Sequence, residues 1–96
     1  MALFVALHQH KAETCPAGDP QMGPMLLQHV SRSNAQQMGV NIHGEAVEQG
    51  SHRLFLIVDA EDQETVDKFM APFGMVGSVE VLPARHCEEV VARKGC

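Results

Sequence analysis

The sequence predicts a single α+β domain in which four antiparallel strands form one sheet and two helices cover one of its faces. Three observations predict this fold. Segments with strand-like and helix-like apolar patterns follow one another in the order strand, helix, strand, strand, helix, strand. The chain has 96 residues, the size of one domain, and 45% of them are hydrophobic. No linker divides the chain, so we expect one domain over residues 1–96, with a short C-terminal extension over 84–96.

The first half of the chain supplies one strand and one helix. Residues 2–10 begin as an apolar run and end in polar residues, which favours a central strand. Residues 11–23 are rich in Gly and Pro and are predicted to form a loop. Asp19, followed by a proline, is a typical helix start. Apolar residues at helical spacing predict one helix over residues 22–38, and Gly39 stands where a helix ends.

The second half supplies a hairpin, a helix and a last strand. Residues 40–48 alternate loosely, residues 49–51 suit a tight turn, and residues 52–59 hold an unbroken apolar run, so we expect two paired strands. Capping residues then precede the clearest helical stripe in the chain, which is formed by Val66, Phe69, Met70 and Phe73. Residues 75–83 predict the last strand, and residues 88–94 predict a short C-terminal helix.

The order and lengths of these elements resemble the ferredoxin-like fold (βαββαβ) and, more narrowly, the dimeric α/β-barrel superfamily. The resemblance covers nearly the whole chain and rests on topology; it implies that two such sheets pair face to face. A physical argument also favours a homodimer, because two helices cover only one face of a sheet. Both faces of the first strand are largely apolar: one carries Phe4, Ala6, His8 and His10, and the other carries Leu3, Val5, Leu7 and Gln9.

Histidine and cysteine are prominent in a chain that has six His and three Cys but no Trp or Tyr. In the predicted sheet the first strand ends near the start of the third. His8 and His10 share one face there, His52 opens the third strand, and Cys15 lies in the loop that follows the first strand. Imidazole and thiolate suit Zn, Ni, Cu or Fe. We therefore predict a transition-metal site formed by His8, His10, Cys15 and His52.

His86 and Cys87 form a second candidate pair just beyond the last strand. The topology puts them at the opposite end of the sheet from His10, so they join the metal site only from a partner chain or through a crossing tail. Each candidate also has a simpler interpretation. The His8–His10 pair can be two half-exposed polar residues at a strand end, and the His86–Cys87 pair a polar approach to the last helix.

Two alternative functions stay open at this point, so the sequence leaves undecided whether the protein is an enzyme. The resemblance to the dimeric α/β-barrel group implies a small-molecule enzyme of the monooxygenase or isomerase type. In that interpretation His43, with Glu45 nearby, is the acid/base of a cavity that takes a small-molecule ligand. The other alternative is an interaction module whose histidines only tune its charge near pH 6.

Composition argues against several other classes. The net charge is −5 and the seven basic residues are scattered, so we expect no nucleic-acid partner. No apolar run approaches the ~18 residues of a membrane helix, so we expect no membrane partner. The cysteines are odd in number and contain no CxxC pair, and no secretory signal pattern is visible. We therefore expect a reducing, cytoplasmic location.

Overall fold

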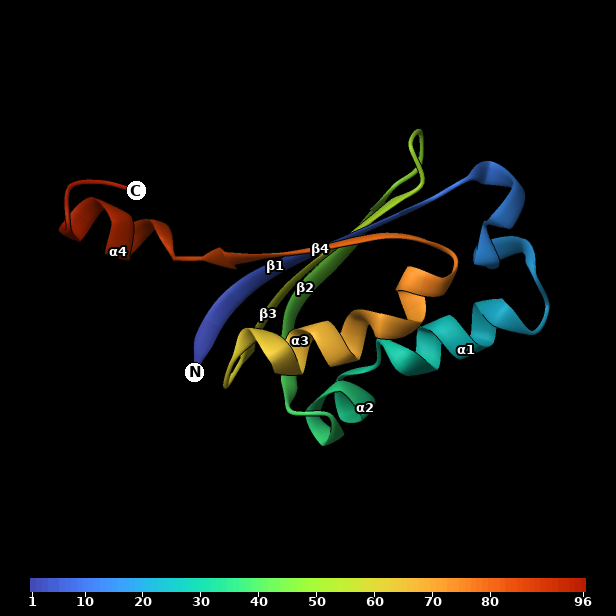
Figure 1. The fold of residues 1–96 in the computed structure, drawn as a ribbon, viewed down its shortest axis with the longest axis horizontal. Helices are drawn as coiled ribbons and strands as arrows, with labels where there is room; N and C mark the ends of the chain where they lie inside the picture. The colour runs from blue at the N-terminus through green and yellow to red at the C-terminus, as the bar shows by residue number, and fades with distance from the viewer.

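One four-stranded antiparallel sheet forms the centre of the molecule, as a computed structural model of residues 1–96 shows (Figure 1). Its strands are β1 (Ala2–His10), β2 (Val40–Glu48), β3 (Arg53–Ala60) and β4 (Gly77–Ala84). The strand order is β2-β3-β1-β4, and every neighbouring pair is antiparallel. The predicted α+β class with one four-stranded antiparallel sheet is confirmed, and β1 lies between β3 and β4.

Helices α1 (Met22–His29), α2 (Arg32–Gln37) and α3 (Gln63–Met70) lie on one side of the sheet (Figure 1). The prediction of a single helix over residues 22–38 is wrong, because the helix is interrupted at Ser31. Ser31 has extended backbone angles, and its side chain accepts a hydrogen bond from the backbone N–H of Asn34, which starts α2. α2 ends before Gly39, whose φ of +80° confirms the predicted glycine stop.

α3 begins where the sequence predicts, because the Asp62 side chain accepts a hydrogen bond from the backbone N–H of Thr65 at 2.9 Å. After Met70 the chain tightens into a 3₁₀ turn over Ala71–Met75, which carries Phe73 into the core. The helix α4 (Cys87–Ala92) follows β4 and projects away from the sheet and the other helices (Figure 1). None of the helices combines the length and the apolar character that crossing a membrane requires.

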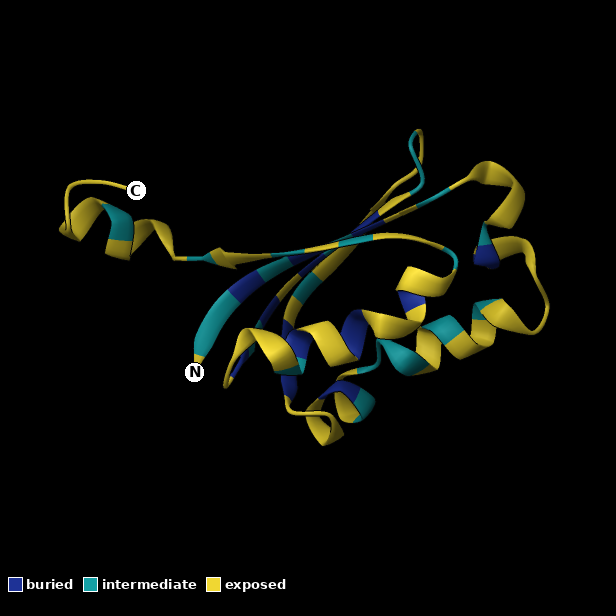
Figure 2. Cartoon of the chain, viewed as in Figure 1, coloured by how far each residue is buried: buried dark blue, intermediate teal, exposed yellow.

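The core fills the space between the sheet and α1–α3, and α3 packs against all four strands. Figure 2 shows the buried residues on the strands and on the inner side of α3. The largest side chains that are completely buried are Phe69, Leu56, Met70, Val40, Val58 and Val66. On β1, burial alternates along the strand, so that Phe4, Ala6 and His8 face the helices.

The opposite surface of the sheet, here called the open face, carries Leu3, Val5, Leu7, Phe55, Ile57 and Leu82. Ile57 and Leu82 are 45% and 43% exposed, and no helix covers them in the single chain. Strand β2 has an irregular register between Ile42 and Gly44, which is a β-bulge at His43.

Candidate metal centre

Three segments bring His10, Cys15 and His52 together at one end of the sheet. One ligand atom from each residue, a ring nitrogen or the Sγ, lies within 4.8 Å of the other two. The rings of His10 and His52 meet at a centroid distance of 5.3 Å. Of the four residues predicted to form the site, these three are the ones that the structure gathers around a common point.

Backbone geometry explains this convergence. β1 and β3 are antiparallel and pair Gln9 with Arg53, so β1 ends beside the start of β3. The backbone N–H of His10 donates to the carbonyl of His52 at 3.2 Å. The predicted strand start at His52 is one residue too early: His52 belongs to the β2–β3 turn and has a φ of 53°. This left-handed conformation ends the turn directly beside His10.

Cys15 is held by a compact loop. The chain makes two 3₁₀ turns, Ala12–Thr14 and Pro16–Gly18, with Cys15 between them. The N–H of Thr14 donates to the carbonyl of Lys11 at 3.0 Å, and the N–H of Cys15 donates to the carbonyl of Ala12 at 3.4 Å. Pro16 is buried, which anchors the loop, and the Cys15 side chain remains half-buried beside the two imidazoles.

His8 uses both ring nitrogens in hydrogen bonds. It is only 2% exposed, its Nδ1 lies 2.9 Å from the carbonyl oxygen of Ser78, and its Nε2 lies 3.2 Å from His10 Nδ1. Because a carbonyl can only accept, Nδ1 of His8 carries a proton, and Nε2 of the neutral ring accepts from His10 Nδ1. This chain of hydrogen bonds fixes the tautomer of His10 and leaves its Nε2 with a free lone pair.

The Nε2 atom of His10 is buried and has no hydrogen-bond partner in the protein. Buried polar atoms are rarely left unpaired, so this atom calls for a specific explanation. Burial lowers the pKa of His8, and the hydrogen bond to the Ser78 carbonyl opposes that shift only in part. Burial also lowers the pKa of His10, with further lowering from the charges of His8 and His52. Both shifts favour the neutral imidazoles that bind metals.

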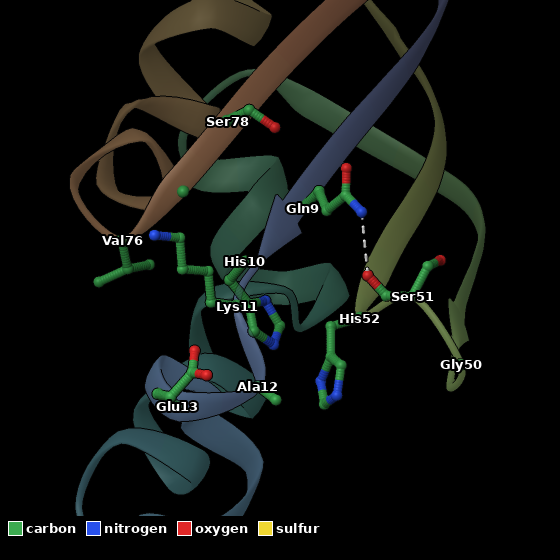
Figure 3. Close-up of a pocket in the computed structure, with 11 residues that line it drawn as sticks. Gln9, His10, Lys11, Ala12, Glu13, Gly50, Ser51, His52, Val76 and Ser78 are labelled. Carbon is green, nitrogen blue, oxygen red and sulfur yellow. Dashed lines mark hydrogen bonds between the residues drawn. The ribbon is translucent and has the colours of Figure 1, made fainter.

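Two hollows meet at the triad formed by His10, Cys15 and His52. The outer one is an open cleft of about 640 Å³ whose rim includes Lys11 and Glu13 (Figure 3). The inner one is a smaller pocket of about 240 Å³ with mainly apolar walls. His10, His52 and Val76 line both hollows, so they form the wall between them, and Cys15 lines the inner pocket.

The remaining predicted residues lie elsewhere. His86 and Cys87 follow β4, whose last residue pairs with Leu3 at the far end of β1, so this chain alone does not bring them to His10. His43 lies at the β2 bulge, and its Nε2 lies 2.6 Å from Asp59 Oδ2, so its partner is Asp59 rather than Glu45. Asp59 alternates with buried residues of β3, which places the pair on the open face.

Two residues that position the site, Gly77 and Ser78, were not predicted from the sequence. Gly77 pairs with His10 across β1 and β4; a Cβ there would overlap the backbone carbonyl of Gln9 and lie 2.9 Å from His8 Cε1. Ser78 supplies the carbonyl that orients His8. The only available signal was the glycine at the start of the last predicted strand, because a strand glycine often marks a close approach of two chains.

Comparisons with known proteins give one result at the level of a family. No curated protein matches the sequence. The sequence model of one family, described as a domain of unknown function (DUF3303), matches residues 12–94. The matched range contains Cys15 and His52 and begins shortly after His10. Since the match spans most of the chain, the protein belongs to the DUF3303 family.

Proposed function

We propose that this protein binds one transition-metal ion through His10 Nε2, Cys15 Sγ and a ring nitrogen of His52. The observation that carries the proposal is the buried, unpaired Nε2 of His10, one of the three residues of the cluster. The hydrogen bonds of His8 to the Ser78 carbonyl and to His10 Nδ1 supply the orientation that metal-binding histidines generally receive from a second partner. His8, which the sequence suggested as a ligand, is therefore a positioning residue in this proposal.

The donor set suits zinc and also copper, nickel or iron, since imidazole and thiolate bind all of them. Bonds of about 2.0 Å to nitrogen and 2.3 Å to sulfur put the ligands of a tetrahedral ion about 3.3–3.6 Å apart. The present separations reach up to 4.8 Å, so small side-chain rotations close the triad around an ion. Three protein ligands leave a fourth position free, which is typical of reactive rather than structural zinc sites.

The fold supports a further part of this proposal, a homodimer of ferredoxin-like subunits paired as a dimeric α/β barrel. The strand order β2-β3-β1-β4 with antiparallel neighbours is consistent with the βαββαβ arrangement. The open face presents Ile57 and Leu82 to solvent in the single chain, and a second sheet would cover them. α4 projects beyond its own sheet, so it is free to pack on a partner. His86 and Cys87 then reach a metal site only in the partner chain.

Metal analysis tests the central proposal. Protein purified without a histidine tag is dialysed against zinc, copper, nickel or iron in turn and then against metal-free buffer, and the retained metal is measured. We expect about one ion per chain for at least one metal, and loss of retention in His10→Ala and Cys15→Ser. The matched control is His43→Ala, which removes an exposed histidine on the open face. Retention of no metal by the wild-type protein contradicts the proposal.

One observation favours a second candidate, an acid/base role for His43. Its 2.6 Å contact with Asp59 forms a histidine–carboxylate pair, and the other carboxylate oxygen, Oδ1, is buried without a partner. A carboxylate in this position fixes the orientation and the tautomer of an imidazole. In the single chain the pair lies on the open face, so a cavity around it requires the partner sheet. If the protein turns over a substrate and the turnover rate is the same in His43→Ala, His43 has no acid/base role.

A further inference from the structure

The pocket behind the metal triad differs in character from the outer cleft. It holds about 240 Å³, and its apolar walls include Leu26 from α1, Leu54 from β3 and Phe73 from the turn after α3. No Asp, Glu, Lys or Arg lines it. A cavity of about 150 Å³ is already large enough to admit benzene. This pocket is therefore large enough for one ring with a short substituent.

Charge balance restricts what binds at the fourth metal position. A divalent ion held by two neutral imidazoles and one thiolate has a net charge of +1. The wall residues of the inner pocket offer no carboxylate to neutralise it. Unbalanced charge is unfavourable in apolar surroundings, so an anionic fourth ligand is strongly preferred there to a neutral one.

On the basis of the proposed metal site, we infer that the pocket binds a small molecule in which an apolar body of about one ring carries a single anionic donor, a thiolate or a carboxylate. The donor occupies the fourth metal position and the ring lies against Leu54 and Phe73. On binding a thiol, the S–H proton passes to solvent, the sulfur donates an electron pair to the metal, and the water in the fourth position leaves. A carboxylate replaces the water without releasing a proton.

The metal position borders the inner pocket. His10 and His52 separate the open outer cleft from the inner pocket, and the metal position lies between them. A ligand whose donor binds this metal therefore holds its ring next to the apolar walls of the inner pocket. Burial of the ring in that pocket removes apolar surface from water, which strengthens binding. We therefore expect the ring to strengthen binding by about tenfold or more over the donor alone.

Visible spectroscopy of the cobalt(II)-loaded protein tests this inference and the metal site separately. A sulfur-to-cobalt band in the wild type that is lost in Cys15→Ser reports the metal site. Phenylmethanethiol is then compared with 2-mercaptoethanol, and benzoate with acetate, with benzyl alcohol as a ring that lacks an anionic donor. We expect phenylmethanethiol or benzoate to shift the cobalt spectrum at concentrations about tenfold or more below its ringless counterpart, and benzyl alcohol to cause no shift.

A pocket variant shows where the ring lies. Val47 lines the inner pocket and is 56% exposed, so Val47→Phe narrows the pocket without disturbing the core. Val91→Phe on α4 is the matched control, because Val91 is also exposed and lies far from the pocket. We expect Val47→Phe to weaken the ring ligand about tenfold while the cobalt band persists, and Val91→Phe to have no effect.

The outcomes separate the two proposals. Failure of the wild type to bind cobalt overturns the metal site and this inference together. Cobalt binding with equal affinity for ringed and ringless donors overturns only the inference. A ring preference that Val47→Phe leaves unchanged also overturns it, because the ring then lies outside this pocket.

Discussion

Replacing His8 with phenylalanine removes the partner of His10 and leaves all three proposed ligands in place. The structure gives His8 two hydrogen bonds, at 2.9 Å to the Ser78 carbonyl and at 3.2 Å to His10 Nδ1. Without the second bond, the His10 ring is free to take the other tautomer and to rotate. Outer partners of metal-binding histidines are typically worth about 10–100-fold in affinity, or about 1.4–2.7 kcal/mol. We expect His8→Phe to lower zinc affinity by that factor.

The same substitution also affects folding. It leaves the Ser78 carbonyl without its hydrogen-bond partner, which lowers the free energy of unfolding by about 1–3 kcal/mol. The new ring packs near Phe73, as the His8 ring does now at a centroid distance of 5.0 Å. His29→Phe is the matched control. The His29 ring also bonds a backbone carbonyl, that of Phe69 at 2.8 Å, but it lies outside the triad. The His29→Phe variant should lose stability without losing zinc affinity.

Competition against a chromophoric chelator measures both zinc affinities, and thermal unfolding measures both stabilities. Two results would contradict this role of His8. An unchanged affinity in His8→Phe means that the hydrogen-bond chain does not orient His10. A loss of affinity well beyond about 100-fold, with one nitrogen fewer around the zinc that is still bound at high zinc concentration, means that His8 is itself a ligand, as the sequence first suggested.

Three further predictions concern the strand contact, acid and the open face. Gly77→Ala forces β1 and β4 apart beside His8, so it should lower both the melting temperature and zinc affinity; a variant with wild-type values for both contradicts this. Because burial lowers the pKa values of His8 and His10 below the ordinary 6.5, the folded, metal-free protein binds fewer protons there than the unfolded chain. The stability that neutral His8 and His10 contribute is therefore fully present above pH 6.5 and falls as the pH drops below it; urea midpoints measured over this range should decrease, and less so in His8→Phe. Ile57→Lys on the open face should convert a dimer to a monomer in light scattering, while Leu27→Lys on the exposed side of α1 should not; equal masses for both variants count against the proposed pairing.

Much of the fold follows from patterns within single segments. Apolar runs fix the strands, and the stripe that includes Phe69 fixes α3, because burial on one face imposes the period of each element. The break at Ser31 was not predicted, since the apolar spacing on either side continues at a helical period. A serine can sit inside a helix or cap a new one, and local sequence does not distinguish these two outcomes.

The part of the candidate site that depends only on strand topology was predictable from the sequence. Antiparallel pairing of the first and third strands placed His10 and His52 together, and the Gly/Pro loop allowed Cys15 to return to them. The separate role of His8 was not predictable, because it depends on the β1–β4 register. A shift of one residue would turn His8 away from the helices and from the Ser78 carbonyl.

The identity of the ligands is the most direct test of the proposed metal centre. X-ray absorption spectroscopy of the zinc-loaded, untagged protein counts the nitrogen and sulfur neighbours of the ion and gives their distances. We predict two imidazole nitrogens at about 2.0 Å, one sulfur at about 2.3 Å and one further light atom, with the sulfur lost in Cys15→Ser. A zinc ion surrounded only by nitrogen and oxygen, or one that keeps its sulfur in Cys15→Ser, contradicts the proposed centre.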